Sequence, residues 1–500
     1  MVDCVTKALR RILHGAGIVV VGTLIGMFFK FATKILLARS FERSQYGTLS
    51  LTFTVLRIAL TVSLLGISKG LPREVARFKA TRKNLEPLVF SGLLLGVASS
   101  LVASTALYLL APLLGEYMDD PNLPLALRLV SISLPFGAVI KILISVSRGL
   151  GRLREKLYYA HIVQPSVYLL SLGAMVLLNV INIEGVILGY VLSLTVTSLL
   201  LLRDMSRNML IRTAFNIRTA TALLLFSVPL MFKGILGYVM NWTDTLMVGH
   251  YLGPDAVGLY HAATPLARLL LIPISAMGFL FVPLATELYA EGKGKALLRL
   301  YVLVTRWIYM LSFPIFITLF VFPGGVISFV MGKNYEGAAS ALRLLALGFM
   351  VHNALGPNGL TLVSIGRPLS TFAFTGIAAV VNVALNMALI PTYGITGAAA
   401  ATATSYVAVN LLRSWWLYKN SGVHPFTPDY IKMVTAGVVL LSVGLVMGRV
   451  GVSPVATMGV LLVAYIVVIT GLGCVGKEDW ELIQGTFKEI RGLIRRLMGR

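Results

Sequence analysis

Carboxylate side chains are scarce in this sequence of 500 residues, which has 20 Asp and Glu against 43 Lys and Arg and a formal net charge of +23. Cysteine is scarcer still, because Cys4 and Cys474 are the only two and stand near opposite ends of the chain. This spacing excludes a disulfide framework and a cysteine-based metal cluster. Charged residues amount to 13% of the chain and hydrophobic residues to 57%, a balance that excludes a soluble protein of this length.

The surplus of positive charge does not indicate nucleic-acid binding, because the basic residues stand in short clusters between long apolar runs. Apolar runs of about 18 or more residues are typical of transmembrane helices, and the period-two alternation of a membrane β-barrel is absent. We therefore expect an all-α polytopic membrane protein with fourteen transmembrane helices. The apolar segments lie near residues 15–38, 46–68, 87–112, 125–147, 158–180, 183–202, 220–247, 256–286, 300–325, 338–364, 370–391, 394–418, 433–449 and 454–475.

The connections between these segments predict the orientation of the chain. The termini and the even-to-odd connections hold 29 of the 43 basic residues, whereas the odd-to-even connections hold four, at Arg39, Arg43, Lys333 and Arg449. Since Lys and Arg are enriched in cytoplasmic connections, both termini are expected in the cytoplasm of a multi-pass plasma-membrane protein.

Several residues recur in register in two parts of the chain. Gly47 and Gly258 each open a span, Arg57 and Arg268 each follow ten residues later, and Pro72 and Pro283 follow at twenty-five. Such a parallel repeat predicts two pseudo-symmetric six-helix lobes that frame a central site. The expected segments are a cytoplasmic N-terminus (1–14), the first lobe (15–203), a cytoplasmic linker (204–219), the second lobe (220–418), spans 13 and 14 (430–475) and an amphipathic cytoplasmic helix (477–500) that would lie on anionic lipids.

Charges within the spans are nearly all positive. Apart from Glu184 at the very start of the segment 183–202, Asp244 is the only acidic residue there, against ten basic residues. Because an ion is costly in the bilayer core, this surplus favours a water-filled cavity lined by positive charge and an anionic passenger. The expected lining residues are Lys30, Lys34, Arg57, Lys233, Asn241 and Arg268. For Asp244 the alternatives are an ion pair between the lobes, the coupling of transport to a cation such as H⁺ or Na⁺, and direct contact with the substrate.

Three stretches resemble a known family. LARSFERSQYGTLSLTFTVLRIALTVSLLGISKGLPREVARF (37–78) resembles the opening of the polysaccharide-type flippases of the multidrug/oligosaccharidyl-lipid/polysaccharide (MOP) exporter superfamily. SVPLMFKGILGYVMNWTDTLMVGHYLGPDAVGLYHAATPLARLLLIP (227–273) resembles the start of their second half, and IPTYGITGAAAATATSYVAVN (390–410) their junction of spans 11 and 12. The resemblance implies a V-shaped transporter that works by alternating access on a glycan linked to a polyprenyl (pyro)phosphate.

The resemblance also implies roles for individual residues. Relatives that flip the lipid-linked peptidoglycan precursor carry cations in spans 1, 2 and 8, where Lys30, Lys34, Arg57 and Arg268 stand here. We expect Arg57, Arg268 and Lys30 to hold the phosphates, and Asn241 and Asn382 to meet sugar hydroxyls. We expect a monomer without a cofactor, a catalytic residue or a bound metal.

Other functions fit the sequence less well. A drug or cation antiporter of the same superfamily (MATE-like) would need carboxylates that face the cavity. An integral-membrane glycosyltransferase or acyltransferase would need acidic or His residues near a membrane face and a sizeable loop, but no connection exceeds about 20 residues. A flippase for the peptidoglycan precursor, or a scramblase without coupled transport, stays open as an alternative.

Overall fold

The computed structural model describes residues 22, 25–152, 155–207, 214–450 and 454–471, so the predicted N-terminal segment (1–14) and the amphipathic helix (477–500) lie outside the described residues. The described part of the chain contains helices and connections but no strand, which confirms the expected all-α class. The first helix comprises residues 25–40. It is followed by α2 (Arg43–Ser63), α3 (Ile67–Ala80), α4 (Glu86–Tyr117), α5 (Leu123–Ser131), α6 (Leu134–Gly149), η1 (Lys156–Val163), α7 (Gln164–Leu177), α8 (Ile183–Arg207), α9 (Ile217–Ala267), η2 (Arg268–Leu270), α10 (Leu271–Ala290), α11 (Gly294–Val321), α12 (Pro323–Val330), η3 (Lys333–Ala338), α13 (Ala339–Ala354), α14 (Asn358–Ser364), α15 (Pro368–Ser421), α16 (Pro428–Arg449) and α17 (Pro454–Gly471).

Many of these helices are long and apolar enough to cross a membrane. Within the described residues nine helices qualify, and a tenth is counted if α5 and α6, which are bent by 47°, form one span. A multi-pass membrane protein is therefore supported. The figure of fourteen spans stays a prediction, because several expected spans are broken or share one continuous helix.

The longest helices are broken by glycine. At 54 residues, α15 would be about 80 Å long if straight, whereas the hydrocarbon core of a bilayer is about 30 Å thick. Its Gly394 has φ 60°, and Gly253 in α9 has φ 74°, a left-handed backbone that glycine adopts without a steric cost. The two breaks fall where the sequence predicts the connections after spans 7 and 11. Thus α15 contains two of the expected spans, whereas α9 contains span 7 and the beginning of span 8, which continues into α10.

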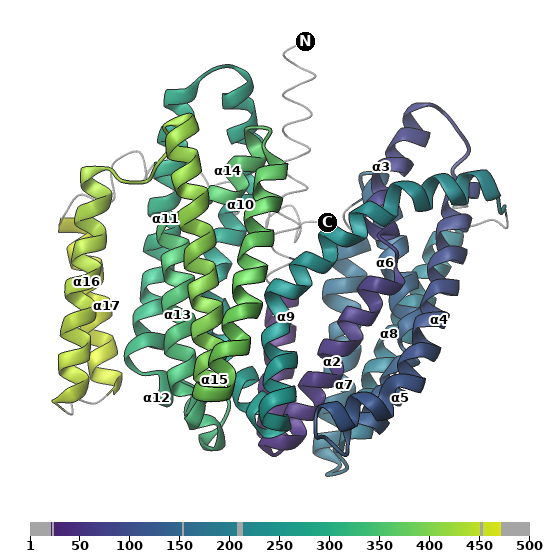
Figure 1. Cartoon of the computed structure of the whole chain (residues 1–500), viewed down its shortest axis with the longest axis horizontal. Coiled ribbons are helices and arrows are strands. Elements are labelled where there is room, and N and C mark those ends of the chain that lie inside the picture. The colour runs from purple at the N-terminus through teal and green to yellow at the C-terminus, as the bar shows by residue number, and fades with distance from the viewer. Residues whose placement is uncertain (1–21, 23–24, 153–154, 208–213, 451–453, 472–500) are drawn as a thin grey trace, which may run out of the picture.

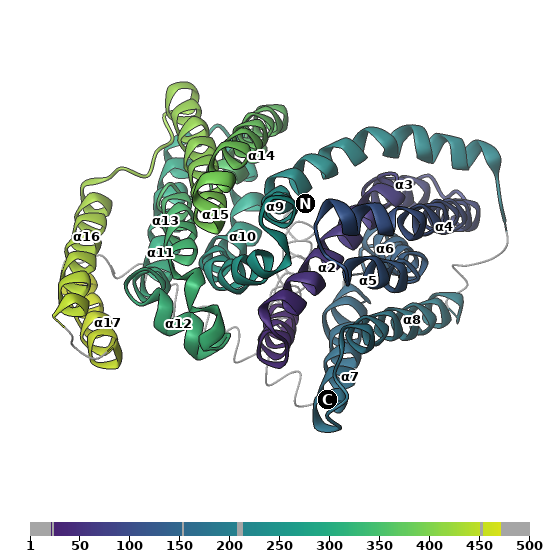
Figure 2. The ribbon, with the colours of Figure 1, turned by 60° about the horizontal axis from the view of Figure 1, so that its bottom comes forward.

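The helices gather in two groups (Figure 1). The first half comprises the helices from residue 25 to α8, the second half comprises α10 to α15, and α9 lies between the two groups. Turning the molecule shows the beginning of α9 arching over α3 and α4 of the first half (Figure 2), where Leu223 of α9 packs in their apolar core. A separate core around Phe281 and Tyr301 lies within the second half.

The two halves meet where α2 crosses α9, at the glycines that mark the sequence repeat. A Cβ atom added at Gly47 would collide with the carbonyl oxygen of Pro254, four residues before Gly258. A Cβ atom added at Gly258 would collide with the carbonyl oxygen of Arg43, four residues before Gly47. This reciprocal geometry requires glycine on both helices, and it explains why the two positions correspond.

Polar bonds surround this crossing and join the halves further. We call these bonds, together with the glycine crossing, the clasp. The Arg43 Nε lies 3.3 Å from Asp255 Oδ1, and Arg39 donates hydrogen bonds to the carbonyl oxygens of Phe329 and Val330 at the end of α12. The Tyr335 hydroxyl donates to the carbonyl oxygen of Phe41 at 3.3 Å. The turn that leads from the first helix into α2 is thus fixed to the second half.

Candidate functional site

A cavity of about 550 Å³ lies between the two halves, next to the clasp. The first helix, α2, α7 and α8 contribute its wall on one side, and α9, η2 and α10 contribute the other. Its volume falls in the range of about 300–1,000 Å³ that is usual for small-molecule sites. Because both halves line it, any rocking of one half against the other would change its shape.

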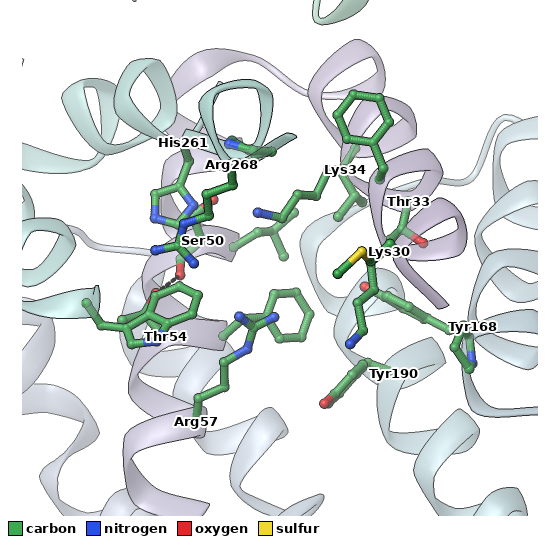
Figure 3. A pocket seen from close by; sticks show the side chains of 18 of the residues that line it. Lys30, Thr33, Lys34, Ser50, Thr54, Arg57, Tyr168, Tyr190, His261 and Arg268 are labelled. Carbon is green, nitrogen blue, oxygen red and sulfur yellow. Dashed lines mark hydrogen bonds between the residues drawn. The ribbon is translucent and has the colours of Figure 1, made fainter. Parts of the chain in front are cut away.

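Four of the cations predicted from the sequence line this cavity. Lys30 and Lys34 stand one turn apart on the first helix, Arg57 lies on α2, and Arg268 lies on η2. Lys34, Arg57 and Arg268 direct their charged groups into the same space, as Figure 3 shows. Among the described residues that line the cavity, none carries a carboxylate. An anionic group is therefore the kind of ligand that this lining favours.

Trp242 connects the two arginines, although they lie 211 positions apart in the sequence. The Arg57 Cζ is 4.7 Å and the Arg268 Cζ 5.3 Å from the centroid of the Trp242 ring. A guanidinium over an indole ring is stabilised by about 0.5–2 kcal/mol, depending on its exposure. The ring thus holds both guanidinium groups at one end of the cavity. No periodicity or motif around Trp242 indicates this role in the sequence.

An aromatic cluster lines the part of the cavity formed by α2, α7 and α8. Phe53, Tyr168 and Tyr190 contact one another with ring centroids 5.0 to 6.4 Å apart, and all three line the cavity. Gln164 lies beside them and donates a hydrogen bond to Ser193 Oγ at 3.3 Å. Aromatic rings and an amide are suited to a polar, uncharged group such as a sugar. No sequence pattern connects these residues, because they are spread over α2, α7 and α8.

Asp244 is buried behind the lining of the cavity, near Arg268. Asp244 is only 5% exposed. Its carboxylate accepts hydrogen bonds from Tyr260 Oη at 2.6 Å, Thr245 N at 2.8 Å and Thr402 Oγ1 at 3.4 Å. These bonds join three helical segments, namely α9 before its break, α9 after its break and α15. Asp244 does not line the cavity in this structure.

His261 lies between this carboxylate and the cavity. It lines the cavity although it is only 5% exposed, and its Nε2 is 3.0 Å from Thr245 Oγ1. Thr245 Oγ1 is in turn 3.5 Å from Asp244 Oδ1. No motif in the sequence distinguishes His261, which is not among the predicted site residues.

The other residues predicted to line the cavity or to meet the sugar are not among the described residues of its lining. Lys233 and Asn241 both belong to α9, but they are not among the residues whose side chains the structure describes. Asn382 is 1% exposed and donates a hydrogen bond to Thr402 Oγ1 at 3.4 Å. Since Asn382 is packed inside the second half, it does not face the cavity, and the expectation that it meets sugar hydroxyls there is wrong for this structure.

Known proteins share this fold. The chain superposes on the lipid II flippase MurJ in an inward closed conformation with a TM-score of 0.72, at 13% identity, covering 91% of this chain and 98% of that chain. An inward-facing multidrug resistance MATE family transporter of the MOP superfamily gives a TM-score of 0.67 at 13% identity, covering 79% of this chain and 94% of that one. At these identities the likeness shows the fold.

Curated relatives match by sequence. A probable low-salt glycan biosynthesis flippase, Agl15 of Haloferax volcanii, is 24% identical over 202 residues, which are 40% of this chain and 43% of that protein. An uncharacterized membrane protein of Methanocaldococcus jannaschii is 29% identical over 37% of this chain and 38% of its own length, so these two matches span less than half of either relative. The lipopolysaccharide biosynthesis protein WzxC of Escherichia coli is 21% identical over 73% of this chain and 72% of its own length.

A family match decides membership. Residues 36–340, more than half of the chain, match the family described as polysaccharide biosynthesis protein. This stretch includes α2, α9, the clasp, Arg57 and Arg268, and it agrees with the resemblance seen in the sequence. The chain therefore belongs to the polysaccharide biosynthesis protein family.

Proposed function

We propose that this protein flips lipid-linked oligosaccharide or polysaccharide precursors from the cytoplasmic to the outer leaflet of the plasma membrane. The observation that carries this proposal is the cavity between the halves, where Lys30, Lys34, Arg57 and Arg268 stand without a carboxylate among the described lining residues. A lipid-linked sugar (pyro)phosphate supplies the anionic group that such a lining favours. The probable glycan flippase among the relatives is consistent with this substrate class.

The cavity offers a separate place for each part of such a substrate. The guanidinium groups of Arg57 and Arg268 would bind the phosphate oxygens through charge-assisted hydrogen bonds, with Lys34 and Lys30 adding positive charge. The first sugar would lie towards Tyr168, Tyr190 and Gln164. The polyprenyl chain would stay in the lipid, because the apolar tail gains nothing from entering a charged cavity.

Transport would proceed by alternating access of two six-helix lobes in a V, within a monomer of fourteen spans whose termini are cytoplasmic. In this orientation the turn that carries Arg39 and Arg43 is on the outer side, so the clasp closes the outer entrance of the cavity. Rocking of the lobes would break the clasp and expose the cavity to the outer leaflet. The terminal segment 477–500 would rest on anionic lipids of the cytoplasmic leaflet.

One alternative substrate is favoured by a specific observation. The superposition on a lipid II flippase, and the cations in spans 1, 2 and 8, fit a lipid-linked peptidoglycan precursor as well. A drug or cation antiporter fits less well, because cationic drugs would be repelled by the same lining. Only a transport experiment with both kinds of substrate distinguishes a glycan precursor from the peptidoglycan precursor.

A reconstituted assay tests the proposal. The purified chain in proteoliposomes should move fluorescently labelled polyprenyl-pyrophosphate-linked sugars between leaflets, measured as the fraction that becomes accessible to a membrane-impermeant quencher. A panel with several glycans, the peptidoglycan precursor and a cationic dye separates the alternatives. Movement of the dye with no movement of any lipid-linked sugar would contradict the proposed function.

We expect Asp244 to couple transport to a cation, since its buried carboxylate is held by hydroxyl and amide donors behind the cavity. Asp244→Asn keeps the shape of the side chain but removes its charge and its ability to exchange a proton. We expect this variant to lose the acceleration that a proton or sodium gradient gives to the wild type. Unchanged flipping at every pH and gradient would assign Asp244 a structural role instead.

A further inference from the structure

We infer that His261 and Thr245 form the link through which the occupied cavity acts on Asp244, so that the cargo and a proton are moved together. The inference rests on the proposed function and adds the identity of the coupling ion and the residues that couple it. His261 is suited to this role because it lines the cavity and contacts Thr245, whose hydroxyl group is within reach of Asp244.

The link depends on a single hydroxyl group. Thr245 Oγ1 lies 3.0 Å from His261 Nε2 and 3.5 Å from Asp244 Oδ1, but its hydroxyl has one proton to donate. When His261 is neutral and Nε2 carries no proton, Thr245 donates to the ring. When Nε2 carries a proton, the ring donates to Thr245 Oγ1, and the threonine proton is free to turn towards Asp244 Oδ1. For a neutral ring that carries its proton on Nδ1, protonation at Nε2 therefore decides whether the carboxylate gains this donor.

The groups around the ring connect its state to the cargo. Lys34 of the first helix, Arg57 of α2 and Arg268 of η2 act on the ring through space, and Tyr46 Oη of α2 donates to the His261 carbonyl oxygen at 3.5 Å. On α9 itself, Tyr260 already donates to Asp244 Oδ2. A phosphate bound among the three cations would place negative charge beside the ring, and a nearby negative charge favours the imidazolium form.

The proton balance follows from this arrangement. As the anionic group enters the cavity, the ring takes one proton from water and becomes an imidazolium with N–H groups at both nitrogens. Thr245 then turns its hydroxyl proton to Asp244. The bond from Thr245 to Asp244 keeps the ring from losing this proton while the cargo is in the cavity. When the cargo leaves on the outer side, the negative charge is removed and the ring returns its proton to water, so one proton crosses with each lipid-linked sugar.

Two conservative substitutions at Thr245 and one at His261 test the link. Thr245→Val keeps the shape of the side chain and removes the hydroxyl, whereas Thr245→Ser keeps the hydroxyl. In proteoliposomes with the more acidic solution on the cytoplasmic face of the protein, and with the membrane potential clamped, we expect flipping by the wild type and the serine variant to accelerate several-fold. We expect the valine variant to flip at one rate with or without the gradient.

Proton uptake gives a second readout that a structural role would not change. In weakly buffered solution with a pH indicator, the wild type should take up about one proton per bound polyprenyl-pyrophosphate-linked sugar. His261→Gln should lose this uptake. Thr245→Val should keep it, because the ring is intact and only its connection to Asp244 is cut.

These experiments distinguish a failure of the inference from a failure of the proposed function. A valine variant that responds to the gradient like the wild type would overturn the inference while leaving the proposed function intact. So would a wild type that takes up no proton on binding, or one that responds to a sodium gradient alone. A wild type that moves none of the lipid-linked sugars would contradict the proposed function and the inference together. Thermal unfolding in detergent, with the serine variant as reference, checks that the valine variant is folded.

Discussion

Arg57→Ala and Arg268→Ala are each expected to lower the flipping rate at limiting substrate by roughly 10- to 100-fold, and the double variant is expected to abolish detectable transport. Each arginine lines the cavity and stands over Trp242, so both guanidinium groups are held in place before the cargo arrives. A hydrogen bond to a charged group contributes about 1.5–3 kcal/mol, which corresponds to this range in affinity. The measurement is the initial rate of the quenching assay together with the binding of a soluble sugar diphosphate.

Two controls make this result specific. Arg343→Ala removes an exposed arginine that packs on Phe320 and does not line the cavity, so flipping should stay at the wild-type rate. Arg57→Lys keeps the charge but loses the planar fork of donors, and we expect an intermediate rate. Wild-type transport by the double alanine variant, at equal expression, would show that the cavity assignment is incorrect.

Gly47→Ala and Gly258→Ala are expected to open the clasp. At each position a Cβ atom would collide with a backbone carbonyl of the other helix, and a backbone atom has little freedom to move aside. Overpacking of this kind costs about 1–3 kcal/mol, which would lower the population of the closed state by roughly 5- to 150-fold relative to the open one. Flipping should slow, because the cavity would seldom close on the outer side.

A cysteine reporter measures this opening. Ser50→Cys places a thiol on the cavity wall close to the clasp, in a background from which Cys4 and Cys474 have been removed. A membrane-impermeant maleimide applied from outside should label it slowly in the reference protein and markedly faster with Gly47→Ala or Gly258→Ala.

Other glycines of the chain provide matched controls for the same substitution. Gly173 in α7 and Gly459 in α17 have no neighbouring atom within 4 Å of an added Cβ. Alanine at these helical positions should leave labelling and flipping unchanged, and it favours the helix by up to about 1 kcal/mol. Equal labelling of all four variants would show that the glycine crossing does not close the outer entrance.

Much of the candidate site could be predicted from the sequence because charge inside an apolar run is costly wherever it occurs. Lys30, Lys34, Arg57 and Arg268 stood out for this reason, and all four line the cavity. The repeat also indicated that Gly47 and Gly258 are equivalent, although no sequence pattern indicated that they contact each other. Their crossing depends on the angle between α2 and α9, which is set by packing along both helices.

The aromatic and hydroxyl groups of the site could not be found in this way. Trp242, Tyr168 and Tyr190 are ordinary residues for an apolar span, and only their approach to the cations and to one another distinguishes them. Thr245 and His261 lie 16 positions apart, and they meet because α9 breaks at Gly253 between them. Asn382 shows the opposite case, since its polarity indicated the cavity but packing placed it inside the second half.

The sequence by itself thus determined the all-α membrane class of the protein and the sign of the charge in its candidate site. These properties follow from the free energy of transferring each side chain into the bilayer, which depends on residue type and spacing along one helix. Only the tertiary structure decided which of these charges share a cavity, which ring holds the two arginines and which hydroxyl reaches Asp244. Those contacts join segments separated by up to about 200 residues, and their geometry depends on helix packing that no local pattern encodes.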